Sequence, residues 1–166
     1  TKGAKKIISL EPFPINYDYG KSNILKNNML NQIEFLNAGC GPNSSKITID
    51  STFSGVSNQM TSSEHGIEID QYSLSDLIEK FSISNCILKM DCEGCEYDTI
   101  LSSSKETLQK FEQIKISYHY GYKNIVKKLR QSGFKVHYTR PLYYYNTFTE
   151  ESKMFLGDIH AQKLIL

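Results

Sequence analysis

A short apolar segment that ends in a cluster of acids constrains the fold of this chain more than any other feature. Residues 85–91, NCILKMD, have the length and composition of a buried strand. They lead to Glu93, Gly94 and Glu96 and then to a helical pattern of apolar residues. A glycine at such a junction is typical of a tight turn. The segment therefore predicts a strand–turn–helix unit with carboxylates at the tip of the strand.

Strand-like and helix-like segments alternate along the rest of the chain. Strand patterns lie at 5–10, 32–39, 46–50, 66–70, 113–119 and 134–139. Helical patterns lie at 15–29, 73–81, 97–103, 105–111 and 123–132. We expect the final segment, 153–166, to fold back as an edge strand. The order predicts one domain over residues 1–166, an α/β fold with a doubly wound, mostly parallel, Rossmann-like sheet.

Polar residues stand where several of these strands end. In a doubly wound sheet, ligands bind outside the carboxyl ends of the strands. The residues at those ends are Glu11, Asn37, Ala38, Asp91, Glu93, His119 and Tyr120. We expect them to converge on one rim of one sheet.

Composition excludes several classes of function. With 19 basic and 18 acidic residues the net charge is +1, which gives no field for a nucleic acid or an anionic membrane. No apolar run reaches the roughly 20 residues that span a bilayer, and no signal peptide is visible. Four cysteines are too few for a disulfide scaffold. We therefore expect a cytoplasmic protein with free thiols.

Several segments in order resemble the FkbM-type methyltransferases. The sequence LKMDCEGCE, at 88–96, resembles the family signature Leu-Lys-x-Asp-x-Glu-Gly-x-Glu. The segments ISLEPFP at 8–14, LNAGCG at 36–41 and ISYHYGY at 116–122 resemble further parts of that family. The resemblance covers residues 3–136, and the Tyr-rich segment after Arg140 has no clear counterpart.

This resemblance implies a class I fold that uses S-adenosylmethionine to methylate a hydroxyl of a sugar, glycan or secondary metabolite. It implies that Glu11 binds the ribose hydroxyls and that Asn37 and Ala38 border the adenine. Asp91 and Glu93 would then face the acceptor and the methionine end of the cofactor. The expected partner is a small-molecule or carbohydrate acceptor.

One part of the family pattern is missing from the sequence. Class I methyltransferases place a strand and a glycine-rich turn before the segment at which this chain opens. The turn-like residues Asn37–Gly41 do not replace it, because Pro42 and polar residues lead directly into another strand. We therefore expect a partial methyltransferase domain rather than a divergent sheet that closes differently. The alternative is a non-catalytic or vestigial binding module that does not bind the cofactor alone.

The catalytic residues that the sequence favours are His119, Asp91 and Glu93. A histidine near neutral pH can remove the proton of an acceptor hydroxyl, and the two acids can orient it or bind sugar hydroxyls. The alternative for a lone histidine is a place on the surface. A hard divalent cation on the same three residues is possible but not favoured, so no metal site is predicted.

Other residues near the signature have structural interpretations. Cys92 and Cys95 have the spacing of half a zinc site or a redox pair, but they fit better as small residues that pack a tight turn. Glu96 suits the dipole of a helix N-terminus.

Two further features remain open. The aromatic residues at 143–145 and 148 can stack on a sugar ring or, more simply, pack on the core. An unpaired edge at the final strand would suit a homodimer.

Overall fold

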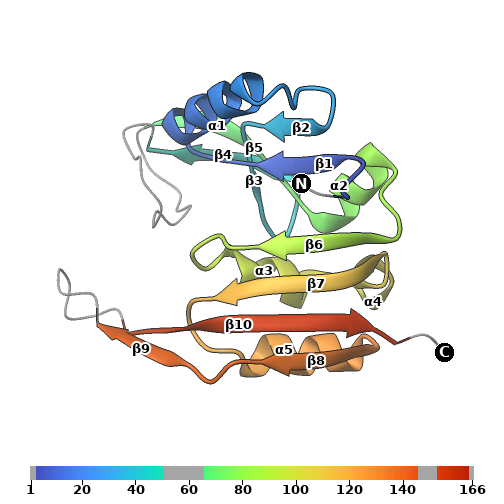
Figure 1. Ribbon diagram of the computed structural model, residues 1–166. Helices are drawn as coiled ribbons and strands as arrows, with labels where there is room; N and C mark the ends of the chain where they lie inside the picture. The colour runs from blue at the N-terminus through green and yellow to red at the C-terminus, as the bar shows by residue number, and fades with distance from the viewer. Residues whose placement is uncertain (1–2, 51–65, 146–152, 165–166) are drawn as a thin grey trace. The chain divides into compact units, whose positions relative to one another are not determined.

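The computed structural model describes residues 3–50, 66–145 and 153–164 (Figure 1). The chain divides into two compact units, which we call the first and the second unit. The first contains residues 1–40 and 44–72, and the second contains residues 41–43 and 73–166.

The first unit has two small sheets and one helix. Its elements are β1 (Ile7–Leu10), α1 (Pro14–Lys26), β2 (Ile33–Leu36), β3 (Ala38–Cys40), β4 (Ser45–Ile49) and β5 (Ile67–Tyr72). β1 pairs with β2 in parallel, while β5 pairs in parallel with β3 and antiparallel with β4. Phe13, Ile49 and Ile69 form a buried cluster against which Ile47 packs. This cluster holds the start of α1 against the strands of the second small sheet.

The second unit contains the largest sheet. Its elements are α2 (Leu74–Phe81), β6 (Cys86–Met90), α3 (Cys95–Ser102), α4 (Lys105–Leu108), β7 (Phe111–Tyr118), α5 (Lys123–Gln131), β8 (Phe134–Tyr138), β9 (Leu142–Tyr145) and β10 (Lys153–Lys163). The strand order is β6-β7-β10-β8, with β9 also paired to β10. β6 and β7 are parallel, and β10 is antiparallel to all of its partners.

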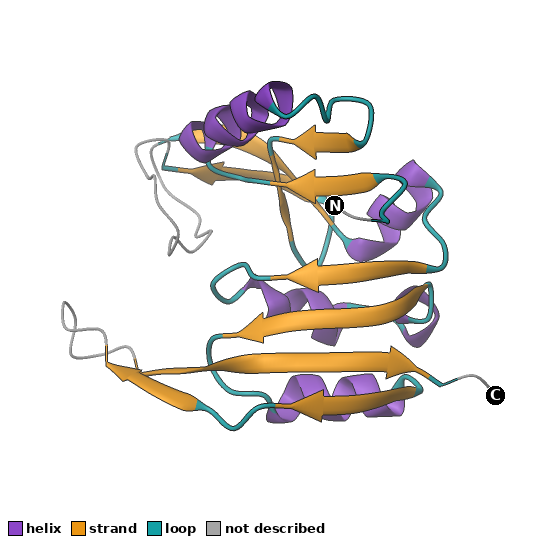
Figure 2. Cartoon of the chain, viewed as in Figure 1, coloured by secondary structure: helices purple, strands orange, loops and turns teal. Residues whose placement is uncertain are grey.

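The core of the second unit lies between this sheet and its helices (Figure 2). Alternate residues of β7 are buried, among them Ile114 and Ile116. The helix α5 presents Ile125 and Leu129, one turn apart on one face, and both are fully buried. This packing fixes α3, which carries Glu96, and the end of β7, which His119 follows.

The prediction of one mostly parallel sheet was wrong. The α/β class is right, but the described strands form three sheets, and the largest is mixed. The predicted strand 32–39 divides at Asn37, whose side-chain amide donates to the backbone oxygens of Glu11 and Pro12, both at 2.9 Å. Because the chain turns there, β2 pairs with β1 and β3 pairs with β5. The strand ends named from the sequence therefore belong to different sheets.

The final strand was also predicted wrongly, because β10 is not an edge. It lies between β7 and β8, with Ile159 and Ala161 almost completely buried. Sequence alternation indicates a strand but not its position in a sheet. Over 159–162 both sides of β10 are paired, so the final strand gives no support to a homodimer, which stays a prediction.

The aromatic segment is strand-forming at 143–145, within β9, and residue 148 lies outside the described residues. No helix in the described part of the chain is long and apolar enough to cross a membrane.

We expect Gly157→Ala to destabilise the second unit. A Cβ at this position of β10 would come within 2.7 Å of Thr139 Oγ1 and closer still to the phenol of Tyr118. Tyr118 is buried and donates to the backbone oxygen of Thr139 at 2.9 Å, so its ring has little room to move. The free energy of unfolding in urea should fall by about 1–3 kcal/mol.

Gln162→Ala, at an exposed position of the same strand, is the matched control and should change stability by less than about 0.5 kcal/mol. Equal stability of Gly157→Ala and wild type would contradict the packing described here.

Candidate functional site

Asp91 and His119 meet because they follow neighbouring parallel strands. β6 ends at Met90, which pairs with Ile116 of β7, so the carboxyl ends of the two strands lie together. His119 Nε2 lies 3.8 Å from Asp91 Oδ1 and 3.3 Å from Glu93 Oε2. The predicted meeting of these three residues is present in the structure.

A tight left-handed turn presents Glu93 to the histidine. Glu93 has φ 54° and Gly94 has φ 125°, and α3 begins at the next residue. For a residue with a side chain this conformation costs about 1–2 kcal/mol, so the surroundings must hold it in place. A disulfide between Cys92 and Cys95 closes the same turn.

The disulfide corrects the prediction that all cysteines are free. Cys92 and Cys95 are three residues apart, with 5.4 Å between their Cα atoms, and the turn brings the sulfurs together. Cys40 and Cys86 are not part of a disulfide. The pair is therefore a covalent clasp across the turn rather than two separate packing residues.

Glu96 is the site residue that sequence reasoning missed. Its side chain is completely buried, and Oε2 accepts the Gly94 N–H at 2.9 Å. Oε1 lies 2.9 Å from His119 Nδ1. Two donors thus compensate the burial of this carboxylate. The sequence gives one signal, the spacing that places Glu96 on the same helical face as Thr99 and Ile100. The structure shows that this face is buried.

His119 is buried, contrary to its alternative placement as a surface histidine. Only 6% of the residue is exposed. Its hydrogen bond with Glu96 raises the pKa of His119 above the ordinary value; burial opposes this effect, and Glu93 and Asp91 add to it. Burial raises the pKa of Glu93, and the nearby imidazole partly offsets this. With Nδ1 on Glu96, Nε2 is the atom that faces Asp91 and Glu93.

Further contacts fix the chain on both sides of His119. Tyr97 of α3 donates to the backbone oxygen of Gly121 at 2.6 Å and accepts the Tyr120 N–H at 2.7 Å. Burial raises the pKa of Tyr97 to about 12, so the phenol stays a donor at neutral pH. The Phe155 N–H donates to the His119 oxygen at 2.9 Å. The imidazole is therefore held by α3 and β10 as well as by its own strand.

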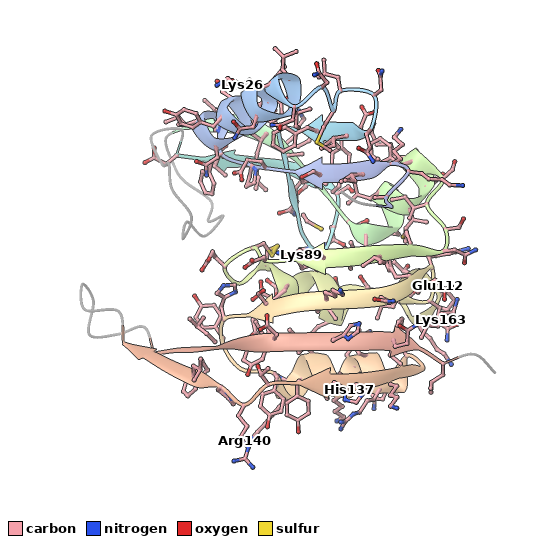
Figure 3. The ribbon with its side chains drawn as sticks, viewed as in Figure 1. Lys26, Lys89, Glu112, His137, Arg140 and Lys163 are labelled. Carbon is pink, nitrogen blue, oxygen red and sulfur yellow. A yellow bond between two sulfur atoms is a disulfide. The ribbon has the colours of Figure 1, made fainter. Side chains whose placement is uncertain are left out.

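Lys89 forms an ion pair with Asp91, and its position is labelled in Figure 3. Its Nζ lies 3.1 Å from Asp91 Oδ2. This contact occupies one carboxylate oxygen of Asp91 and leaves the other, Oδ1, on the side of His119.

The other predicted site residues lie in the first unit. Glu11 follows β1, is half-buried, and accepts the Phe13 N–H at 2.9 Å through Oε1. Burial raises the pKa of Glu11, and hydrogen bonds with Phe13 and Asn16 oppose this. Asn37 uses its side-chain amide to brace the tip of β1, and Ala38 is buried. The first unit therefore presents one oriented carboxylate at the end of β1.

Comparison with known proteins agrees with the sequence resemblance. The family model described as the methyltransferase FkbM domain matches residues 1–136. The fold is similar to the crystal structure of Methyltransferase FkbM from Methylobacillus flagellatus KT, with a TM-score of 0.57 and 15% sequence identity. That match covers 95% of this chain and 36% of the other, so the chain spans little more than a third of that protein. No curated protein matches the chain.

We expect Glu96→Gln to lower the pKa of His119. The carboxylate of Glu96 is the largest cause of the raised pKa, and an amide has no charge with which to stabilise the imidazolium. NMR titration of the labelled imidazole, in the presence of a chelator, measures the change. Glu112→Gln is the control, because Glu112 pairs with Lys163 elsewhere on the sheet. An unchanged His119 pKa in Glu96→Gln would contradict this assignment.

The same shift predicts how stability depends on pH. A folded-state pKa above the unfolded value of about 6.5 stabilises the protein fully below that value. This stabilisation is lost as pH rises through the folded-state pKa of His119. Urea denaturation across pH should show a smaller dependence in Glu96→Gln than in wild type.

Proposed function

This chain belongs to the FkbM methyltransferase family, and we propose that it contributes to methyl transfer from S-adenosylmethionine to a hydroxyl of a sugar, glycan or secondary metabolite. The observation that carries the proposal is the cluster of His119, Asp91, Glu93 and Glu96 at the adjacent ends of β6 and β7. Ligands of open α/β sheets bind outside the carboxyl ends of the strands.

Glu11 fits the ribose of the cofactor. The Phe13 N–H fixes one oxygen of its carboxylate, and an ionised carboxylate has further lone pairs to accept from vicinal hydroxyls. In this proposal Asn37 holds the β1 tip in shape, and the backbone near Ala38 borders the adenine. S-adenosylmethionine, when bound, supplies the methyl group.

His119 is the proton acceptor in the absence of a metal ion. Methyl transfer needs the acceptor oxygen to be in line with the methyl carbon and to lose its proton. Nε2 of His119 faces Asp91 and Glu93, and Glu96 contacts Nδ1 on the opposite side of the ring. Asp91 and Glu93 are placed to accept hydrogen bonds from neighbouring hydroxyls of the acceptor.

The remaining expectations stand as part of this proposal. They are a cytoplasmic location, no nucleic-acid or membrane partner, and a homodimer as a possible assembly. Free thiols no longer support a reducing compartment, because two of the four cysteines form a disulfide.

Binding of S-adenosylmethionine to the 166-residue chain tests the cofactor part of the proposal. We expect isothermal titration to give micromolar affinity, with S-adenosylhomocysteine as a second ligand. Glu11→Gln should weaken binding about 10- to 100-fold, since a hydrogen bond to a charged group contributes about 1.5–3 kcal/mol. Glu34→Gln is the control, because Glu34 is an exposed acid of β2 that pairs with Lys6.

Absence of binding by a folded sample would favour the alternative, a methyltransferase-like module that needs more polypeptide to bind the cofactor. Equal affinity of Glu11→Gln and wild type would remove Glu11 from the ribose site.

His119→Ala tests the proton acceptor. With a hydroxylated acceptor and a radiolabelled methyl donor, we expect methyl transfer to fall by about 10²–10⁴-fold. His137→Ala is the matched control, because His137 is exposed on β8. Circular dichroism of both variants checks folding. Full activity of His119→Ala would show that another group takes the proton.

A further inference from the structure

We propose that Asp91, Glu93 and His119 bind one hard divalent cation of the Mg²⁺ or Mn²⁺ type. The binding itself goes beyond methyl transfer, and only the use of the cation in catalysis rests on the proposed function. The sequence alone did not favour a metal site here, whereas the contacts in the folded chain do.

The three side chains already have nearly the spacing of metal ligands. Each offers one ligand atom, and the three atoms lie within 4.8 Å of one another. Nε2 of His119 lies 3.3 Å from Glu93 Oε2 and 3.8 Å from Asp91 Oδ1. Neighbouring ligands of an octahedral cation with bonds of about 2.1 Å are separated by about 3 Å. Small side-chain rotations would therefore bring the three ligand atoms within bonding distance of one ion.

The surroundings of the three residues resemble the outer shell of a metal site. Metal-binding histidines usually donate their other ring N–H to a carboxylate, which fixes the tautomer and the ring. Glu96 provides this partner for Nδ1 of His119 at 2.9 Å and is itself fixed by the Gly94 N–H. Lys89 holds Asp91 by Oδ2 and so turns Oδ1 toward the histidine. Two of the three ligands are thus pre-oriented.

The charge of the cluster also favours a cation. Three carboxylates, those of Asp91, Glu93 and Glu96, surround one imidazole, and Lys89 contacts only the outer oxygen of Asp91. The negative carboxylates repel one another at this separation. A divalent cation between them would attract each of them and so offset the repulsion. The acids Glu68 and Asp70 differ, because they share Lys46 on an exposed strand surface.

The donor set selects the kind of ion. Two carboxylates and one imidazole suit Mg²⁺ and Mn²⁺, whereas the sulfur ligands that select softer metals are tied up in the disulfide at this turn. Three protein ligands leave the remaining coordination positions to water and an acceptor hydroxyl. A cation there would lower the pKa of a bound hydroxyl, so that solvent water can take its proton, and His119 would act as a ligand rather than as the base.

Binding of Mn²⁺ to the 166-residue chain, followed by electron paramagnetic resonance, tests the proposal. The sample contains neither S-adenosylmethionine nor an acceptor. We expect one site that Mg²⁺ competes for, with an electron spin-echo signal from a coordinated imidazole nitrogen. Glu93→Gln should weaken Mn²⁺ binding at least tenfold. Asp91→Asn, at a half-exposed position, provides a second variant that leaves the buried residues unchanged.

Glu68→Gln is the matched control and should bind Mn²⁺ as wild type does. Failure of the wild-type chain to bind millimolar Mn²⁺ would overturn the proposal, as would equal affinity in wild type, Glu93→Gln and Asp91→Asn. Because the assay contains no cofactor, these results do not depend on methyl transfer. Binding of S-adenosylmethionine without binding of Mn²⁺ would leave the proposed function intact and remove the cation.

Discussion

The buried contact between Glu96 and His119 is the interaction on which the rest of the site depends. It ties the first turn of α3 to the end of β7, and it leaves Nε2 to face Asp91 and Glu93. Removing one partner of such a pair typically costs about 3–5 kcal/mol, because the other charge stays buried. Loss of either partner alone would therefore destabilise the second unit, and the intact pair orients its reactive nitrogen.

The turn between β6 and α3 places a second acid, Glu93, on the other side of the His119 ring. Its left-handed residues aim the Glu93 side chain at Nε2, and the Cys92–Cys95 disulfide holds the ends of the turn together. Because Nδ1 is already bonded, the Nε2 edge of the ring, which faces Asp91 and Glu93, can accept a proton or bind a cation without a change in the scaffold. The proposed base and the proposed metal ligand are thus two uses of one geometry.

Much of the architecture was predictable because it depends on local patterns. Ser73 caps α2 as its sequence indicates, with its side chain accepting the Asp76 N–H, and Gly133 follows α5 at φ 90°. The parallel pair β6 and β7 follows from an apolar strand, a helical connection and a second strand, so Asp91 and His119 were expected at one edge. The insertion of β10 between β7 and β8 was not expected, since β10 pairs with residues 21 to 49 positions earlier in the chain, and such pairing leaves no local pattern.

The sequence alone determined the kinds of element, the family, and the residues at the strand ends, because periodicity and turn chemistry act over a few residues. Only the tertiary structure decided which of those residues meet. It divided the strand at Asn37, buried Glu96 against His119 and joined Cys92 to Cys95. Each of these depends on atoms brought together by folding, where the need to pair buried polar groups outweighs the local preference of any single residue.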